Sequence, residues 1–319
     1  MIKKFKRKLF FLYNMMRGFY WQFIVKFFPQ IHASYEMKRQ HQVNLIRRPN
    51  IKQPLYFNEK MLWLKYYLYN DSPIVAMCFN KYLVREYVKS KGLQSILNTL
   101  YFEADTINDI PWDNLPEECV IKYSNGYAGH VFKRKNKPFN KIESIELLEE
   151  TKRRRLYGGK VSGDLFADRT KGVYVCEKFI MADHPDTLPS DYKIHCFHGK
   201  PMFLEYIHDR DYSNKNKFYS SAFIDIINMK DRYDLEGESS PITDIELPQS
   251  FDLMQEYAQI LSQDFPYVRV DFYEEAGKPI FGELTFTPYH SQTKTSLEEL
   301  GRLIDLGKAE KYKEILKVK

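Results

Sequence analysis

The sequence is poor in cysteine, and this scarcity limits the kinds of fold it can form. The four cysteines, Cys78, Cys119, Cys176 and Cys196, lie far apart and form no C-x-x-C pair. Each lies in an apolar run, which is typical of a buried thiol in a reducing compartment. We therefore expect four buried free thiols rather than a disulfide framework.

The sequence also lacks a long uninterrupted apolar run. The most apolar stretch, residues 9–28, is interrupted by polar, basic and glycine positions: Asn14, Arg17, Gly18, Gln22 and Lys26. A membrane span needs roughly 20 nearly uninterrupted apolar residues. No small-residue cleavage site follows, so a cleaved signal peptide is not expected.

Residues 9–27 instead have the periodicity of an amphipathic helix. Apolar residues recur at steps of three and four and share one face: Leu9, Leu12, Met16, Tyr20, Phe23 and Phe27. Basic residues occupy the other side: Lys4, Arg7, Lys8, Arg17 and Lys26. The apolar face is explained equally well by a membrane interface and by docking on the protein's own core. Pro29 ends the helix in either case.

The composition is that of a globular protein with uneven charge. Of the 319 residues, 44% are hydrophobic and 28% charged, so we expect two or three domain-sized units. The net charge of +6 includes basic runs at residues 3–8 and 152–155, of which we expect the second to be a solvated face. No nucleic-acid module is recognisable, so an anionic membrane or an acidic polysaccharide is the expected partner.

Helices and strands alternate without a strict βαβ rhythm, which predicts an α+β fold with mixed or antiparallel sheets. Helices are expected within residues 56–91, with Asn58 as N-cap of the first and Gly92 ending the second, and at 141–157 and 251–264. Strands are expected at residues 119–123, 130–133, 173–180, 192–197, 201–208, 267–273 and 279–283. Residues 95–116 should form short strands and turns.

A first chemical signal is a strand, Val120–Tyr123, that delivers Lys122 to a loop with two glycines. Gly126 and Gly129 would let backbone N–H groups approach phosphate oxygens, and Lys122 would add a point charge. Alone the signal is weak, because hairpins with two glycines are common. A second signal is the apolar strand 173–180, which turns polar at Glu177 and Lys178 and has the alternative explanation of an ordinary edge strand. Lys193 then begins a further strand, facing a cleft or solvent.

The third signal is the strongest. Arg269 and Asp271 share one face of a strand, and a short turn at 275–277 can bring Glu283 opposite them. Two carboxylates and an arginine on an otherwise apolar face need a compensating partner. Mg²⁺ held together with nucleotide phosphates supplies one, and a buried ion network is the alternative. His195 and His198 lie on opposite faces of their strand, so a shared metal is not expected.

In this order, the motifs resemble the ATP-grasp superfamily, and within it the TupA-like branch associated with teichuronopeptide and capsular polysaccharide synthesis. The closer resemblance rests on residues 57–64, 81–88, 191–200 and 269–288 and extends over about residues 55–307. It implies an ATP-grasp fold, with two α+β subdomains clamping ATP behind a helical N-terminal region. The boundaries expected are an arm at 1–54, a helical and α/β region at 55–116, a small subdomain at 117–182 and a large subdomain at 183–319.

The resemblance also implies residue roles with ATP and Mg²⁺. Lys81 and Lys122 would contact the α- and β-phosphates under the loop of Gly126 and Gly129. Glu177, Lys178 and Ile180 would line the adenine pocket, and Asp183 would reach the ribose. Lys193 and Arg269 would act on the β/γ-phosphates and the transferring phosphoryl group. Asp271, Glu283 and Thr285 would bind Mg²⁺.

Three positions depart from the family pattern. Asn80 stands where an aspartate commonly precedes the family lysine, and Thr285 stands where many ATP-grasp ligases have an asparagine metal ligand. Residues 289–292 lack the glycine often found near the acceptor site, which leaves the acceptor undefined.

The resemblance implies an ATP-dependent, ADP-forming carboxylate–amine ligase that joins an amine or amino acid to a uronic acid of a surface glycan. A glycan kinase of the same fold, a glycosyltransferase and a non-catalytic ATP-binding scaffold are the alternatives. The expected location is the cytoplasm, with peripheral contact to the inner face of the cytoplasmic membrane through residues 1–28.

Overall fold

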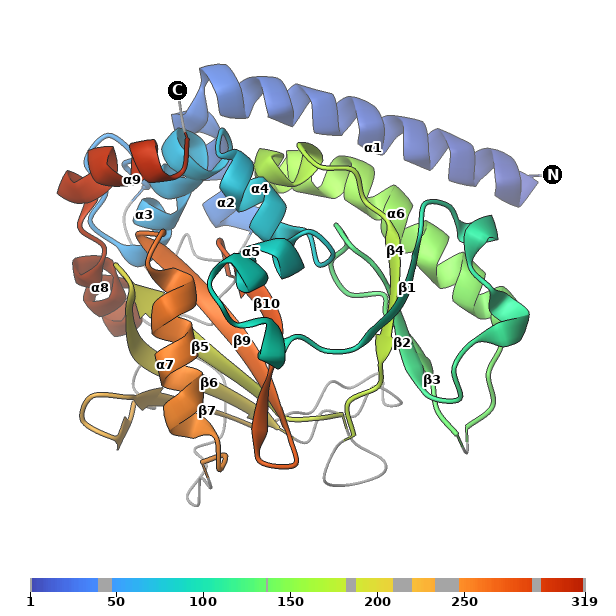
Figure 1. Ribbon diagram of the computed structural model, residues 1–319. Coiled ribbons are helices and arrows are strands. Elements are labelled where there is room, and N and C mark those ends of the chain that lie inside the picture. The colour runs from blue at the N-terminus through green and yellow to red at the C-terminus, as the bar shows by residue number, and fades with distance from the viewer. Residues whose placement is uncertain are drawn as a thin grey trace. The chain divides into compact units, whose positions relative to one another are not determined.

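Residues 2–39, 48–135, 137–181, 188–208, 220–232, 247–288 and 294–317 are described by a computed structural model (Figure 1). They form two units, each built from several stretches of the chain. Unit 1 comprises Met1–Pro54, Leu62–Ala76 and Leu100–Phe179, and unit 2 comprises Leu55–Met61, Met77–Thr99 and Ile180–Lys319.

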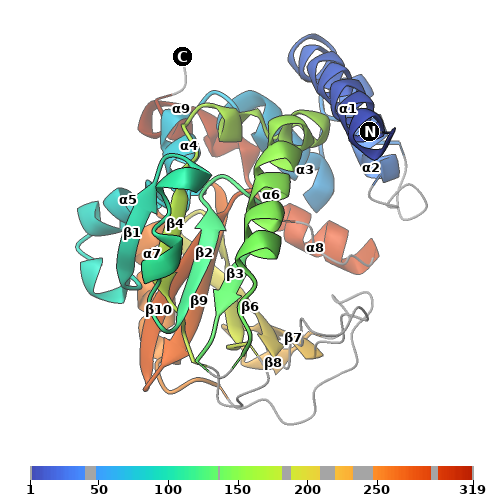
Figure 2. The same cartoon turned by 90° about the vertical axis from the view of Figure 1, so that its right-hand side faces the viewer.

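Unit 1 contains a four-stranded antiparallel sheet in the order β1-β4-β2-β3. Its strands are β1 (Leu100–Ala104), β2 (Cys119–Tyr123), β3 (Val131–Lys133) and β4 (Tyr174–Lys178). Figure 2 shows helix α6 (Lys141–Ser162) lying against this sheet near β2 and β3. Asn140 caps α6 by accepting hydrogen bonds from the N–H groups of Ile142 and Glu143, and Gly163 ends it with φ of 79°.

The core of unit 1 lies between the sheet and α6. Alternate residues of the strands, among them Cys119, Ile121 and Cys176, pack with Leu148 of α6. The opposite sheet face therefore carries the intervening residues, including Lys122 and Glu177. The inward stripe of α6 also buries Arg155, which is 5% exposed and pairs with Asp168 at 3.0 Å. The expectation of a solvated face is thus wrong for Arg155, because helical spacing turns it inward.

The N-terminal part of unit 1 is helical, as predicted. Helix α1 (Ile2–Phe27) runs along α6 on the side away from the sheet, and α2 (Pro29–Arg39) follows it (Figure 1). A short π-helix, η1 (Lys65–Tyr69), comes after α3 (Phe57–Leu64). In the part of the chain that the structure describes, no helix has the length and apolarity needed to cross a membrane.

Unit 2 contains a six-stranded antiparallel sheet in the order β10-β9-β5-β6-β7-β8. The strands are β5 (Asp191–Phe197), β6 (Lys200–His208), β7 (Ser220–Asp225), β8 (Lys230–Asp231), β9 (Tyr267–Glu275) and β10 (Lys278–Thr285). Helix α7 (Phe251–Ser262) packs on β9, β5 and β6. The other α-helices of unit 2 are α5 (Val84–Ser90), α8 (Lys294–Leu303) and α9 (Ala309–Ile315), and the residues of α4 (Pro73–Phe79) are divided between the two units.

The predicted α+β class and antiparallel sheets are confirmed, and the seven predicted strands are all present. All four cysteines are free and buried, as expected. Strands β1, β7 and β8 and helices α8 and α9 were not individually predicted. The prediction of Asn58 as N-cap is wrong, because α3 already begins at Phe57. Glu59 instead accepts hydrogen bonds from the N–H groups of Leu55 and Tyr56.

Candidate nucleotide and metal site

Four neighbouring strands of unit 2 place charged residues side by side in one row. Glu283 on β10 is directly opposite Asp271 on β9, and Asp271 is opposite Lys193 on β5. Lys193 in turn is opposite Glu205 on β6. Residues directly opposite one another in a sheet project from the same face. Across the sheet, the row therefore consists of two carboxylates, one ammonium group and a third carboxylate.

A second row lies two residues along the same strands and hence on the same face. Thr285 is opposite Arg269, and Arg269 is opposite His195. The intervening residues of β5 face α7 instead, since the thiol of Cys196 lies 3.8 Å from the Ala258 carbonyl oxygen of that helix. Both rows thus occupy the sheet face away from α7.

Asp271 is a buried carboxylate that pairs with two cations. Its oxygens accept two hydrogen bonds of 2.7 Å from Nε and Nη2 of Arg269, and Oδ2 also accepts from Nζ of Lys193 at 2.9 Å. Only 4% of its side chain is exposed. Burial opposes the charge of Lys193, but the combined attraction of Asp271, Asp191 and Glu205 outweighs it and raises the pKa of Lys193 above its usual value. Burial likewise opposes the charge of Arg269, but the attraction of Asp271 and Glu205 together is stronger and raises the pKa of Arg269.

Glu283 is held in a more open position. Its side chain is 39% exposed, and Oε2 lies 3.1 Å from Nζ of Lys81, which reaches it from the segment between α4 and α5. Desolvation disfavours the carboxylate, but the attraction of Lys81, Lys193 and Arg269 is stronger and lowers the pKa of Glu283 well below its ordinary range. Glu283 is therefore ionised at neutral pH.

A β-bulge at Gly282 sets the position of Glu283. The register shifts between Phe281 and Glu283, and a side chain at 282 would lie 2.9 Å from the carbonyl oxygen of Asp271. Glycine is thus required for the two strands to approach at this point. Thr285, two residues on, donates its hydroxyl to Oε1 of Glu283 at 3.2 Å.

Asn80, the residue before Lys81, is fully buried and fixes the local backbone. Its Oδ1 accepts hydrogen bonds from the N–H groups of Tyr82 and Leu83, at 2.9 and 3.2 Å. An aspartate would make the same capping contacts. The departure from the family pattern at this position is therefore compatible with the same backbone.

Unit 1 brings together two other predicted residues. Nζ of Lys122 lies 2.9 Å from Oε2 of Glu177, and the two side chains are 18% and 12% exposed. The pair lies on the sheet face away from α6. Lys178 is the next residue of β4, opposite Cys119. Ile180 is buried and begins the unit 2 segment, and Asp183 lies outside the described residues.

The two loop glycines of unit 1 both pack on α6. A Cβ atom at Gly129 would lie 1.9 Å from Oγ1 of Thr151, and one at Gly126 would lie 2.8 Å from its Cγ2. Gly129 also has φ of +69°, a region that favours glycine. Close packing against Thr151 is thus enough to require both glycines, and their contact with phosphates stays a prediction.

The donor set in unit 2 fits Mg²⁺ bound together with phosphates. Carboxylate and hydroxyl oxygens are hard donors that suit Mg²⁺, and Lys81, Lys193 and Arg269 are the cations that phosphate oxygens would need. Within the described ranges, no group of three or more His, Cys, Asp and Glu side chains forms a complete metal centre. Mg²⁺ does not need one, since one or two carboxylates with substrate phosphates and water suffice.

Three further residues belong to this face but were not predicted as site residues. Asp191 lies 3.1 Å from Nζ of Lys193, and Glu205 lies 3.6 Å from Nη1 of Arg269. The buried His195 contacts Glu205 at 3.3 Å and the hydroxyl of Tyr267 at 2.8 Å. His198 instead contacts Tyr312 and the N–H of Asp305, so the two histidines have separate partners. These three residues could have been predicted from the period-two alternation of β5 and β6, which places them on the same face as Lys193.

Comparison with solved structures finds chains of similar fold at low sequence identity. One is a D-alanine–D-alanine ligase from Bacillus anthracis in complex with ATP, at 16% identity over 78% of this chain and 70% of that chain, with a TM-score of 0.42. Another is D-alanyl-alanine synthetase A from Vibrio cholerae, at 12% identity over 76% and 66%, with a TM-score of 0.41. The ATP-grasp ligase PsnB with a minimal precursor is similar at 10% identity over 76% and 63%, also at 0.41.

The chain has no significant match to a curated protein. A family model described as TupA-like ATPgrasp matches residues 59–305, more than three quarters of the sequence. That range contains every predicted site residue of both units. The chain therefore belongs to the TupA-like ATP-grasp family and has its ATP-grasp fold.

Proposed function

We propose that this protein is an ATP-dependent carboxylate–amine ligase that acts on an acidic surface glycan. The observation that carries the proposal is the charged row Glu283–Asp271–Lys193 with Arg269 beside it. Glu283 at one end of the row is 39% exposed, so a ligand could reach it from solvent. Phosphate oxygens of a bound nucleotide could also take the place of the carboxylates as partners of Lys81 and Lys193.

In the proposed reaction, an oxygen of the acceptor carboxylate attacks the γ-phosphorus of ATP. The bond from that phosphorus to the β-phosphate bridging oxygen breaks, and ADP leaves with the electron pair. A neutral amine then attacks the acyl carbon of the acyl phosphate, inorganic phosphate leaves, and the nitrogen loses a proton to solvent. The first step needs positioning and charge stabilisation more than covalent help from the protein.

The residues of unit 2 would hold the phosphates and the metal. Asp271 and Glu283, with Thr285, would bind Mg²⁺, which when bound neutralises charge on the β- and γ-phosphates. Lys193 and Arg269 would hold the γ-phosphoryl oxygens, and Lys81 would hold the α- or β-phosphate. Glu205 would keep the Arg269 guanidinium in place, since its Oε2 lies 3.6 Å from Nη1, and His195 would hold Glu205 through its contact of 3.3 Å with the same oxygen.

The residues of unit 1 would bind the rest of the nucleotide. Lys122 would exchange its partner Glu177 for a phosphate oxygen, and the loop of Gly126 and Gly129 would offer backbone N–H groups. Glu177, Lys178 and Ile180 would contact the adenine. The presence of both a lysine and a carboxylate on one sheet face supports this assignment.

For the substrates, we propose a uronic acid of a capsular or teichuronopeptide-type glycan as the carboxylate and an amino acid or amino sugar as the amine. Membership of the TupA-like family supports this choice of substrate class. We propose the cytoplasm as the place of action, because the reaction consumes ATP.

The test is incubation with Mg-ATP, uronic-acid oligosaccharides and a mixture of amines, followed by mass analysis and ADP assay. We expect an amide product with one ADP formed per amide. Replacing the amine with hydroxylamine should trap the acyl phosphate as a hydroxamate. A stable phosphate increment without amine would show a glycan kinase instead, and a sugar increment would show a glycosyltransferase.

A further inference from the structure

Helix α1 presents a continuous apolar face to solvent. We call the eight large apolar residues on this side the outer face of α1: Leu9, Leu12, Tyr13, Met16, Phe19, Tyr20, Phe23 and Phe27. Their exposed fractions range from 54% to 65%. They recur at the three- and four-residue steps of a helix, so they form one stripe rather than scattered positions. An exposed apolar patch of this extent marks an interaction surface.

A different face of α1 packs on the protein. Gly18 lies against Tyr157 of α6, where a Cβ atom would be 3.3 Å from the Cβ atom of Tyr157. Asn14, Ile24 and Val25 on the same side are buried. The outer face lies on the other side of the helix from these buried residues, and at its edge the ring centroid of Phe19 lies 4.1 Å from Nζ of Lys160 of α6. Of the two explanations for the amphipathic pattern, docking of this face on the protein's own core is not what the structure shows.

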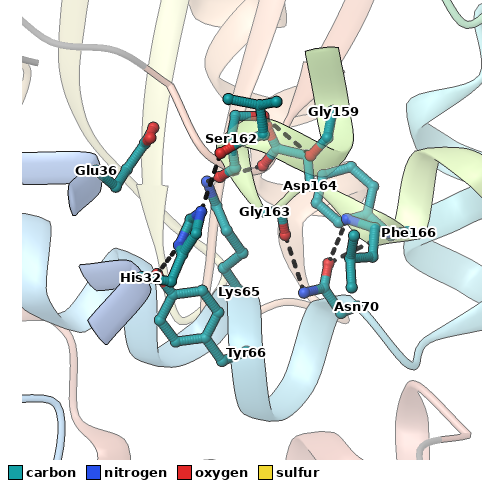
Figure 3. A network of polar contacts seen from close by, with 12 residues as sticks. His32, Glu36, Lys65, Tyr66, Asn70, Gly159, Ser162, Gly163, Asp164 and Phe166 are labelled. Carbon is teal, nitrogen blue, oxygen red and sulfur yellow. Dashed lines mark hydrogen bonds and ion pairs between the residues drawn. The ribbon is translucent and has the colours of Figure 1, made fainter. Parts of the chain in front are cut away.

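The helix is also fixed in place rather than attached as a loose tail. Trp21 of α1 stacks on Tyr35 of α2, with ring centroids 3.8 Å apart. On α2, the buried His32 contacts the hydroxyl of Tyr66 at 2.6 Å and the carbonyl oxygen of Val161 at 3.0 Å (Figure 3).

The ion pair between Lys65 and Asp164, at 2.9 Å, lies beside this contact and joins η1 to the end of α6 (Figure 3). We call the contacts of His32 with Tyr66 and Val161 the α2 joint. The α2 joint and the stacked rings of Trp21 and Tyr35 thus connect α1 and α2 to the rest of unit 1.

The charge of the chain is concentrated on the same helix. Of the 48 basic residues, seven lie in α1, which contains no acidic residue: Lys3, Lys4, Lys6, Arg7, Lys8, Arg17 and Lys26. The other 41 are balanced by 42 acidic residues elsewhere. The net positive charge of the protein thus belongs to the helix that carries the outer face.

We infer that the outer face of α1 docks on an anionic lipid bilayer, with the helix lying in the plane of the interface. Aromatic side chains prefer the boundary between headgroups and acyl chains, and basic residues are attracted to anionic headgroups. A second copy of this chain is the poorer occupant, because pairing two such helices would bring fourteen like charges together. The inference does not depend on the proposed ligase function.

The test is co-sedimentation of the full chain with vesicles. We expect wild type to bind vesicles of phosphatidylcholine with 30% phosphatidylglycerol at least tenfold more tightly than pure phosphatidylcholine, and less tightly at high salt. The variant Met16→Gln/Tyr20→Gln/Phe23→Gln should lose at least tenfold in binding to the anionic vesicles. The matched control Ile142→Gln/Ile227→Gln/Leu253→Gln removes exposed apolar residues elsewhere and should bind as wild type.

Two results would overturn the inference. Wild type that stays in the supernatant with anionic vesicles would exclude a lipid partner, whatever the variants do. Sedimentation velocity that shows self-association of wild type, lost in the outer-face variant but with no vesicle binding, would assign the surface to a second copy. Unchanged melting temperatures of both triple variants would show that the fold is intact in each comparison.

Discussion

Asp271 is the residue on which the charges of the site converge, and Glu283 is the one that can be altered at least structural cost. Asp271 is 4% exposed and bonded to both Arg269 and Lys193, so its removal would leave two buried cations without their main partner. Such a loss is strongly destabilising. Glu283 is 39% exposed and its pair with Lys81 is screened by solvent. Glu283 is therefore the better probe of catalysis.

For Glu283→Gln we expect nucleotide binding to persist and turnover to fall by about 10², or about 2.7 kcal/mol of transition-state stabilisation. The physical reason is the loss of one anionic Mg²⁺ ligand at unchanged side-chain volume. ADP release measured against Mg²⁺ concentration and ATP affinity measured by calorimetry test this together. Glu275→Gln, at the other end of the same hairpin, is the control and should behave as wild type.

A structural role alone would produce the opposite pattern for Glu283→Gln. The melting temperature would fall, and the remaining activity would keep its normal Mg²⁺ dependence. That pattern would show that Glu283 does not bind the metal and that its role is the ion pair with Lys81.

For Lys122→Ala we expect ATP affinity to fall by an order of magnitude or more, since charge-assisted contacts are worth about 1.5–3 kcal/mol each. Calorimetric titration with ATP measures it. Because Lys122 also pairs with Glu177, the single variant should melt at a lower temperature. Lys135→Ala removes an exposed charge from unit 1 and serves as the control.

The double variant Lys122→Met/Glu177→Gln separates the two effects. Removing both charges should restore the melting temperature without restoring ATP affinity. Unchanged ATP affinity in folded Lys122→Ala protein would exclude this lysine from phosphate binding.

Among the elements, the α2 joint makes the stability of unit 1 depend on pH. Burial lowers the pKa of His32 to about 4 from its ordinary 6.5. The neutral imidazole is therefore favoured in the fold, and protonation favours unfolding. The stabilisation is present above about pH 6.5 and is lost as pH falls toward 4, by roughly 3 kcal/mol at about 1.36 kcal/mol per pKa unit.

Comparison of wild type with His32→Gln should show this dependence. Between pH 7 and 4, we expect the melting temperature of wild type to fall more steeply than that of the variant. His195 and His198, whose pKa values burial also lowers, are present in both proteins and cancel in the difference. Equal slopes for the two proteins would show that His32 is not what titrates.

At the scale of the whole molecule, binding of Mg-ATP should stabilise the protein through mass action. At 100 times the dissociation constant we expect about 2.7 kcal/mol of additional stability. Differential scanning calorimetry with ATP, with and without Mg²⁺, measures it. The gain should shrink when EDTA removes the metal and in Glu283→Gln. A gain that is the same with and without Mg²⁺ would argue against a metal at Asp271 and Glu283.

The sequence alone determined the parts of the site that lie on one hairpin. Arg269 and Asp271 alternate on β9, and a short turn leads to Glu283 on β10, so local register places them together. The predicted start of the helix at residue 141 is likewise local, because Asn140 caps it, whereas α6 continues past the predicted end at residue 157 to Ser162. The order of motifs along the chain was enough to indicate the family, which the match over residues 59–305 then showed.

Only the tertiary structure decided which distant residues complete each group. Lys193 reaches Asp271 across 78 positions of sequence, and Glu205 joins them because β5 lies between β9 and β6. Strand order depends on packing of the whole sheet and not on any local pattern. Helix α1 is a second example, because apolar residues also lie on its packed side, where Ile24 and Val25 are buried. Periodicity found the outer face, but contact of the opposite side with α6 decided that this face is left exposed.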